Sequence, residues 1–163
     1  MRSPDLPPDR NQIVSRLGHR GKTQAVYYRD PQGREPVNDW LEKLLATKPA
    51  AVAKIDDFVA EHLNDRGADA PPSEFPITSQ IEGGLRELRV RFANTRYRLL
   101  YQRSGNLFVL LHALEKNTGA LPVADKQIAQ QRFADFKQRM DAESRKPPRA
   151  AGHDAPSRRG IER

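Results

Sequence analysis

The chain has 163 residues, which suits one domain with tails, and no cysteine, which excludes disulfides, thiol catalysis and cysteine-ligated zinc. Its 28 lysines and arginines exceed its 21 acids, and the formal charge of +7 favours an anionic partner, nucleic acid first. The longest apolar run, LFVLLHAL, is far shorter than the roughly 20 residues of a membrane helix. We therefore expect a cytoplasmic protein with no membrane partner.

Both ends of the chain are polar and rich in proline or arginine. Such segments bury too little apolar surface to offset the entropy lost on ordering. The sequence therefore predicts a disordered N-terminal tail at 1–22, a folded domain at 23–143 and a disordered basic C-terminal tail at 144–163. Two interpretations of the tails stay open, a dispensable extension and a non-specific electrostatic arm.

The first half of the domain predicts one strand and two helices. Residues 23–29 are rich in β-formers and end at a DPQG turn. The segment 36–46 begins with proline and repeats apolar residues at helical spacing, which predicts a helix. A second helix is expected from Pro49 to about Arg66, where Gly67 is a plausible stop.

The second half predicts a meander and a last helix. Strands are expected at 85–92, 95–102 and 107–114, because the segments between them are short enough for antiparallel hairpins. The last helix is expected at 123–140. The order β-α-α-β-β-β-α predicts an α+β fold in which all helices pack on one face of a small antiparallel sheet, with the other face open.

Arginines alternate with apolar residues along the first two strands of the meander. Because successive side chains of a strand point to opposite faces, Arg89 and Arg91 are expected on the same open face as Arg96 and Arg98. Four guanidiniums on adjacent strands repel one another. This pattern leaves two interpretations, a solvated basic face braced by acids and a concave site for a phosphate backbone.

Two further residues could extend such a site. Lys116 follows the third strand of the meander, and His112 lies near the end of that strand. The apolar neighbours of His112 in LLHAL favour a buried structural histidine when that residue is taken alone.

Four short motifs in this order, GLRELRVRF, TRYRLLY, LFVLLHALEKNT and a following LP-helix, resemble the RelE/ParE toxin superfamily, most closely its phage-derived HigB-like branch. The resemblance covers about residues 25–140 and implies a RelE-like fold. It also implies the toxin of a type II toxin–antitoxin system, with a HigA-like helix-turn-helix antitoxin as its partner. Such toxins cleave mRNA on the ribosome without metal or other cofactor: the ribose 2′-hydroxyl attacks the adjacent phosphodiester.

The resemblance also assigns residues to the site. It implies that the catalytic residues are Arg89, Arg91, Arg98 and Lys116, with Arg98 stabilising the transition state and Lys116 donating a proton. Residues expected to contact RNA are Arg86, Arg96 and His112.

The sequence departs from the family's pattern at the turn after the third strand. Asn117 and Ala120 stand where the branch has basic residues, and no histidine or carboxylate occupies a matched position for a general base. The residues thus leave weak cleavage and RNA binding alone as alternatives to an active endoribonuclease. A ParE-like inhibitor of DNA gyrase and a non-enzymatic basic nucleic-acid-binding protein are the competing functions.

Overall fold

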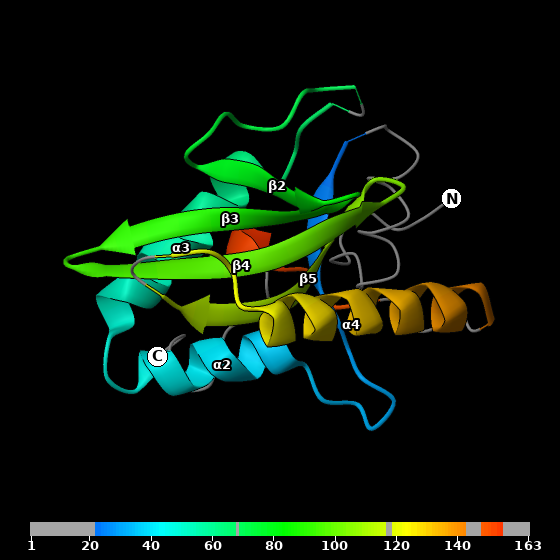
Figure 1. Ribbon diagram of the computed structural model, residues 1–163, viewed down its shortest axis with the longest axis horizontal. Helices are drawn as coiled ribbons and strands as arrows, with labels where there is room; N and C mark the ends of the chain where they lie inside the picture. Colours follow the sequence, from blue (N-terminus) through cyan, green and yellow to red (C-terminus); the bar gives the residue numbers. More distant parts are fainter. Residues whose placement is uncertain (1–21, 68, 117–118, 143–147, 155–163) are drawn as a thin grey trace, which may run out of the picture.

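A five-stranded mixed sheet forms the centre of the computed structural model, which describes residues 22–67, 69–116, 119–142 and 148–154 (Figure 1). The strand order across the sheet is β1-β5-β4-β3-β2. β1 pairs with β5 in parallel, and the other three neighbouring pairs are antiparallel. The strands are β1 (Gln24–Tyr27), β2 (Thr78–Glu82), β3 (Leu85–Phe92), β4 (Thr95–Ser104) and β5 (Leu107–Glu115).

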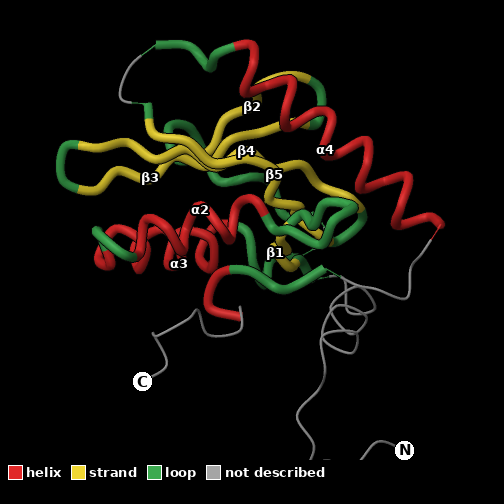
Figure 2. Tube along the Cα trace, turned by 90° about the horizontal axis from the view of Figure 1, so that it is seen from below, coloured by secondary structure: helices red, strands yellow, loops and turns green. Residues whose placement is uncertain are grey.

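Helices cover both faces of the sheet. The helices α2 (Pro36–Leu45) and α3 (Pro49–His62) pack on one face, and α4 (Val123–Ala142) packs on the other. Figure 2 shows the sheet nearly edge-on between these two layers. Two separate apolar cores result, the larger one under α2 and α3 and the smaller one under α4.

The α+β class with three helices is confirmed for the described residues, but the expected arrangement is wrong in two respects. The sheet is mixed, and α4 lies on the face that was expected to be open. The physical reason lies in β5, whose residues Val109, Leu110 and Leu111 are all fully buried. A nearly continuous apolar run is typical of a strand that is covered on both faces.

β2 was not among the predicted strands. It is a short edge strand in which exposed and half-buried residues alternate after Thr78, with an irregularity between Gln80 and Glu82. α3 also ends at His62, earlier than predicted. Asp65 has a positive φ of 62°, and its N–H donates to the carbonyl of Thr23 beside β1. This contact directs the chain away from the helix axis.

Part of the predicted C-terminal tail is packed against the domain. The N–H of Tyr27 donates to the carbonyl of Arg149, and the N–H of Ala151 donates to that of Ala25, along the outer edge of β1. Gly152, with φ 75°, begins the short 3₁₀ helix η1 (Gly152–Asp154) against α3, where a Cβ atom would lie 3.0 Å from Val59. Residues 1–21, 144–147 and 155–163 of the two predicted tails lie outside the described residues.

No helix of the described residues is long and apolar enough to cross a membrane.

Candidate nucleic-acid interface

The hairpin of β3 and β4 carries two cross-strand pairs of arginines. Arg89 lies opposite Arg98, and Arg91 lies opposite Arg96, so all four share one face as the alternation predicted. This hairpin extends beyond the first turn of α4 in both views (Figures 1 and 2). The arginine face, defined as these four residues with Lys116, therefore lies at the end of the sheet that α4 leaves uncovered.

A single buried carboxylate, that of Glu87, holds two of these arginines. Its Oε1 accepts from Nε of Arg98 at 2.8 Å, and its Oε2 accepts from Nη2 of Arg98 at 3.1 Å. Oε2 also accepts from Nε of Arg89 at 2.7 Å and from the hydroxyl of Ser79 at 3.3 Å. The carboxylate thus offsets the repulsion that opposed like charges would otherwise produce.

These contacts fix the charge state of Glu87. Burial by itself raises the pKa of this carboxyl, but the hydrogen bonds and charges of Arg98 and Arg89 outweigh burial and hold the pKa below its usual value. Glu87 is therefore an anion at neutral pH with both oxygens engaged. Such a group is a poor general base.

Arg98 is the least exposed cation of the arginine face. Only 4% of the residue is exposed, and Nη1 lies 3.5 Å from the carbonyl of Gly119 while the other two nitrogens contact Glu87. Arg98 is therefore buried beneath the accessible part of the arginine face. It contacts Glu87 directly, and Glu87 in turn contacts Arg89.

The more accessible cations lie toward the tip of the hairpin. Arg91 is exposed, and its guanidinium makes no ion pair with the described residues. Lys116 is placed beside the strand end by its N–H, which donates to the carbonyl of Arg96 at 3.1 Å. From α3, the ammonium of Lys54 donates to the carbonyl of Arg91 and adds another cation near the tip.

The match to known families covers this hairpin. A family model described as "Phage derived protein Gp49-like (DUF891)" matches residues 40–134, more than half of the chain. The chain belongs to the Gp49-like family. This is a RelE/toxin-like family of phage-derived proteins. A comparison with curated proteins gave no match.

Within the Gp49-like domain, Arg86 does not join the arginine face. It lies opposite Tyr101 on the α2/α3 side of the sheet, where its Nη2 donates to the hydroxyl of Thr78 at 2.9 Å. Its Nε lies 3.4 Å from the hydroxyl of Tyr101. The alternation of β3 already separates Arg86 from Arg89, so the face of this residue could have been read from the sequence.

His112 lies under α4 in a polar cluster. Its Nε2 is 2.6 Å from Oδ1 of Asp125, and its Nδ1 is 3.4 Å from Nη1 of Arg132. Arg132 also donates to the carbonyl of Leu111 at 2.8 Å. Sequence reasoning missed Asp125 and Arg132, although their spacing of seven residues places both on one face of a helix.

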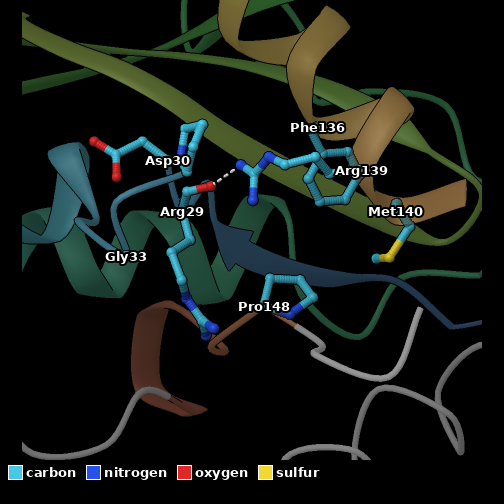
Figure 3. A pocket seen from close by; sticks show the side chains of 8 residues that line it. Arg29, Asp30, Gly33, Phe136, Arg139, Met140 and Pro148 are labelled. Carbon is cyan, nitrogen blue, oxygen red and sulfur yellow. Dashed lines mark hydrogen bonds between the residues drawn. The ribbon is translucent and has the colours of Figure 1, made fainter. Parts of the chain in front are cut away.

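A pocket of about 450 Å³ lies at the other end of the Gp49-like domain, where the C-terminal half of α4 meets the turn after β1 (Figure 3). Its lining residues are Arg29, Asp30, Pro31, Gly33, Phe136, Arg139, Met140 and Pro148. The guanidinium of Arg139 reaches from α4 to the carbonyl of Arg29 across this pocket (Figure 3). The lining residues from α4 lie beyond the range that the family model matches.

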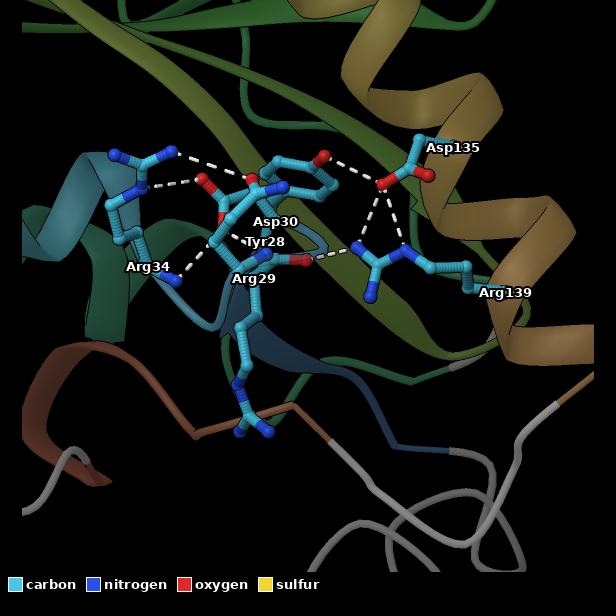
Figure 4. A network of polar contacts seen from close by, with 7 residues as sticks. Tyr28, Arg29, Asp30, Arg34, Asp135 and Arg139 are labelled. Atoms are coloured by element: carbon cyan, nitrogen blue, oxygen red, sulfur yellow. Dashed lines mark hydrogen bonds and ion pairs between the residues drawn. The ribbon is translucent and has the colours of Figure 1, made fainter.

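Hydrogen bonds and ion pairs connect residues at the side of this pocket (Figure 4). The hydroxyl of Tyr28 donates to Oδ2 of Asp135 at 2.6 Å, and Nε and Nη2 of Arg139 donate to the same oxygen. Burial, followed by the hydrogen bond and charge of Asp135, raises the pKa of Tyr28 to about 12. Beside them, Arg34 pairs with Asp30 at 3.1 Å.

Within the described ranges, no three or more His, Cys, Asp or Glu side chains are grouped so that they could hold a metal ion.

Proposed function

We propose that this protein is the toxin of a type II toxin–antitoxin system and cleaves mRNA on the ribosome, as a HigB-like member of its family. Membership of a RelE/toxin-like family supports the proposal. The observation that carries it is the arginine face, where four arginines lie in two cross-strand pairs, with Lys116 beside Arg96, and Glu87 is the one acid of β3 and β4. A HigA-like helix-turn-helix antitoxin is the proposed partner.

The proposed reaction is attack of the ribose 2′-oxygen on the adjacent phosphorus. The new O2′–P bond forms as the P–O5′ bond breaks, which leaves a 2′,3′-cyclic phosphate and a 5′-hydroxyl. Negative charge develops on the phosphate oxygens, and Arg89 and Arg91 stabilise it. Lys116 donates a proton to the leaving oxygen.

Arg98 acts in this proposal through other residues. It is a positioning residue, because its contacts with Glu87 hold the guanidinium of Arg89 in place. The proton of the 2′-hydroxyl passes to a group of the ribosome or of the RNA, since both oxygens of Glu87 are engaged and an arginine, which stays protonated, is a poor base.

The experiment is induction of the protein in bacterial cells, followed by mapping of new mRNA 5′ ends in translated messages. Arg91→Ala is expected to lower cleavage by about 100-fold or more, the scale of losing one preorganised charge-stabilising group. Arg103→Ala is the matched control, because Arg103 lies on the same strand near the opposite turn and donates to the carbonyl of Gly105.

Retained cleavage in a folded Arg91→Ala variant would contradict the placement of the site. Arg98→Ala is expected to reduce cleavage as well, and its fold is checked by circular dichroism because the change leaves Glu87 with fewer partners.

A second candidate is an RNA-binding protein without catalysis. The specific observation in its favour is that Glu87, the acid of the arginine face, is unfit as a base, while Asn117 and Ala120 reduce the charge of the adjacent turn. Growth arrest without mRNA cuts would favour this candidate. DNA damage with intact mRNA would instead indicate a ParE-like inhibitor of gyrase.

A further inference from the structure

An exposed aromatic ring stands beside the arginine face. Phe75 lies in the turn before β2 and is 71% exposed. The other large hydrophobic residue exposed among the described residues is Val123, at the start of α4. Phe75 therefore contributes little to the core, and its ring is accessible to a ligand.

The ring of Phe75 is stacked against one of the proposed phosphate-binding groups. The guanidinium carbon of Arg89 lies 5.1 Å from the ring centroid, within the range of a cation–π contact. The N–H of Arg89 also donates to the carbonyl of Ile77 at 2.8 Å, which ties the turn that carries Phe75 to β3.

Both partners of this stack are held in place before any ligand binds. The carboxylate of Glu87 accepts from Nε of Arg89, while the guanidinium carbon of Arg89 lies over the ring of Phe75. One side of the ring is thus backed by a cation, and the large exposed fraction of Phe75 leaves aromatic surface open to solvent. A preformed flat surface loses little conformational entropy on binding.

Flat aromatic surfaces beside cations have a characteristic ligand. Single-stranded nucleic acids are bound by a basic groove that follows the phosphates and by aromatic side chains on which bases stack. The arginine face supplies the first feature, and Phe75 supplies the second.

We infer that Phe75 is a stacking site for one nucleobase of a single-stranded RNA whose phosphates lie on the arginine face. The inference rests on the proposed function and adds a base-binding element to a site otherwise made of cations. An apolar side chain of a protein partner fits less well, because Phe75 contacts the charged Arg89 and its exposed surface belongs to a single ring.

The test is binding of the full-length protein to two oligonucleotides of about ten nucleotides, measured by fluorescence anisotropy. One is a mixed-sequence 2′-O-methyl RNA, which cannot be cleaved, and the other is an abasic strand with the same phosphates. Phe75→Ala is expected to weaken binding of the base-bearing strand about tenfold and to leave binding of the abasic strand unchanged. Phe75→Trp retains a stacking surface and should bind the base-bearing strand as tightly as the parent.

Val123→Ala is the matched control, since it removes another exposed apolar side chain outside the arginine face. Thermal unfolding checks that each variant is folded.

The outcomes separate this inference from the proposed function. Equal binding of the base-bearing strand by the parent and by Phe75→Ala, with the normal loss of affinity at higher salt, overturns the stacking site and leaves the backbone site intact. If Phe75→Ala loses affinity equally for both oligonucleotides, the stacking site is also overturned, because the substitution then acts through the phosphate contacts of Arg89. Failure of the parent to bind either strand overturns the RNA-binding site itself.

Discussion

The two ends of the sheet use arginine in different ways. At the pocket end, arginines pair with nearby acids, as in the contacts of Arg139 with Asp135 and of Arg34 with Asp30. At the hairpin end, Glu87 serves both Arg89 and Arg98, and Arg91 makes no ion pair with the described residues. Ion-paired arginines at the pocket end stabilise the fold, whereas the guanidinium of Arg91 at the hairpin end is available for an anion.

The number of arginines alone does not locate a binding face. Both ends are rich in guanidiniums, but only the pairing, visible in three dimensions, separates structural cations from available ones. Charged side chains should therefore affect stability where they are held in ion pairs, and RNA binding where, as at Arg91, they are not. Four substitutions test this contrast, in decreasing order of their effect on stability.

Glu87→Gln is expected to lower the free energy of unfolding by about 3–5 kcal/mol, the cost of leaving a buried cation without its partner. Arg98 would remain buried against a neutral amide. Urea unfolding at neutral pH measures the change. The control is Glu82→Gln, at an exposed pair with Lys126, where little or no change is expected because solvent screens the pair. Equal effects at the two sites would remove the distinction between the shared carboxylate and a surface pair.

Glu87→Gln should also change how the free energy of unfolding depends on pH. Because the folded state holds the pKa of Glu87 below its ordinary value of 4.5, the unfolded state binds more protons in acid, and stability falls as the pH drops below that value. Glu87→Gln should make this fall shallower. An unchanged acid profile would show that Glu87 contributes nothing to it.

Tyr28→Phe is expected to lower the free energy of unfolding by about 1–2 kcal/mol, through loss of the hydrogen bond to the Asp135 carboxylate. The folded pKa of Tyr28, about 12, exceeds the ordinary value of 10.0, so the parent loses stability as the pH rises from 10 through 12. The variant should lose less in that interval. Ultraviolet titration of tyrosinate checks the assignment, because the ionisation near pH 12 should disappear.

Arg139→Ala is expected to cost about 1 kcal/mol of stability, since the side chain is partly exposed but contacts both Asp135 and the carbonyl of Arg29. It should not change the dependence of RNA affinity on salt. A reduced salt dependence would place the pocket end within the RNA-binding surface and would contradict the contrast between the two ends.

Arg91→Ala is expected to change the free energy of unfolding by no more than about 0.5 kcal/mol, as is usual for exposed positions. Arg91→Ala should instead weaken the binding of RNA. Loss of one phosphate contact lowers the slope of log affinity against log salt by about 0.7 for a single strand. Destabilisation as large as that of Glu87→Gln would mean that Arg91 is structural.

Local pattern was enough to predict the helices and the alternation of the meander. The face shared by Arg89, Arg91, Arg96 and Arg98 follows from strand periodicity alone. The parallel pairing of β1 with β5 could not be predicted in this way, because it joins segments separated by most of the domain. β2 was missed because an edge strand with polar, exposed residues has little apolar signal.

The burial of a side chain was harder to predict than the face of the sheet on which it lies. The alternation of β4 indicates which way Arg98 points, but its burial depends on Glu87 of β3 and on Gly119 of the segment after β5. The side of the sheet that α4 covers also depends on residues far apart in the chain. Its polar residues Asp125 and Asp135 both contact groups on that side, so a simple apolar stripe does not describe the helix.

The described residues after α4 cover one edge of the sheet. A bare outer strand presents free N–H and C=O groups that a second copy could extend into a continuous sheet. Here Arg149 and Ala151 occupy those groups along β1, while the opposite border is the short, polar and irregular β2. A protein shortened to residue 147 would lose the first of these protections and should assemble edge to edge.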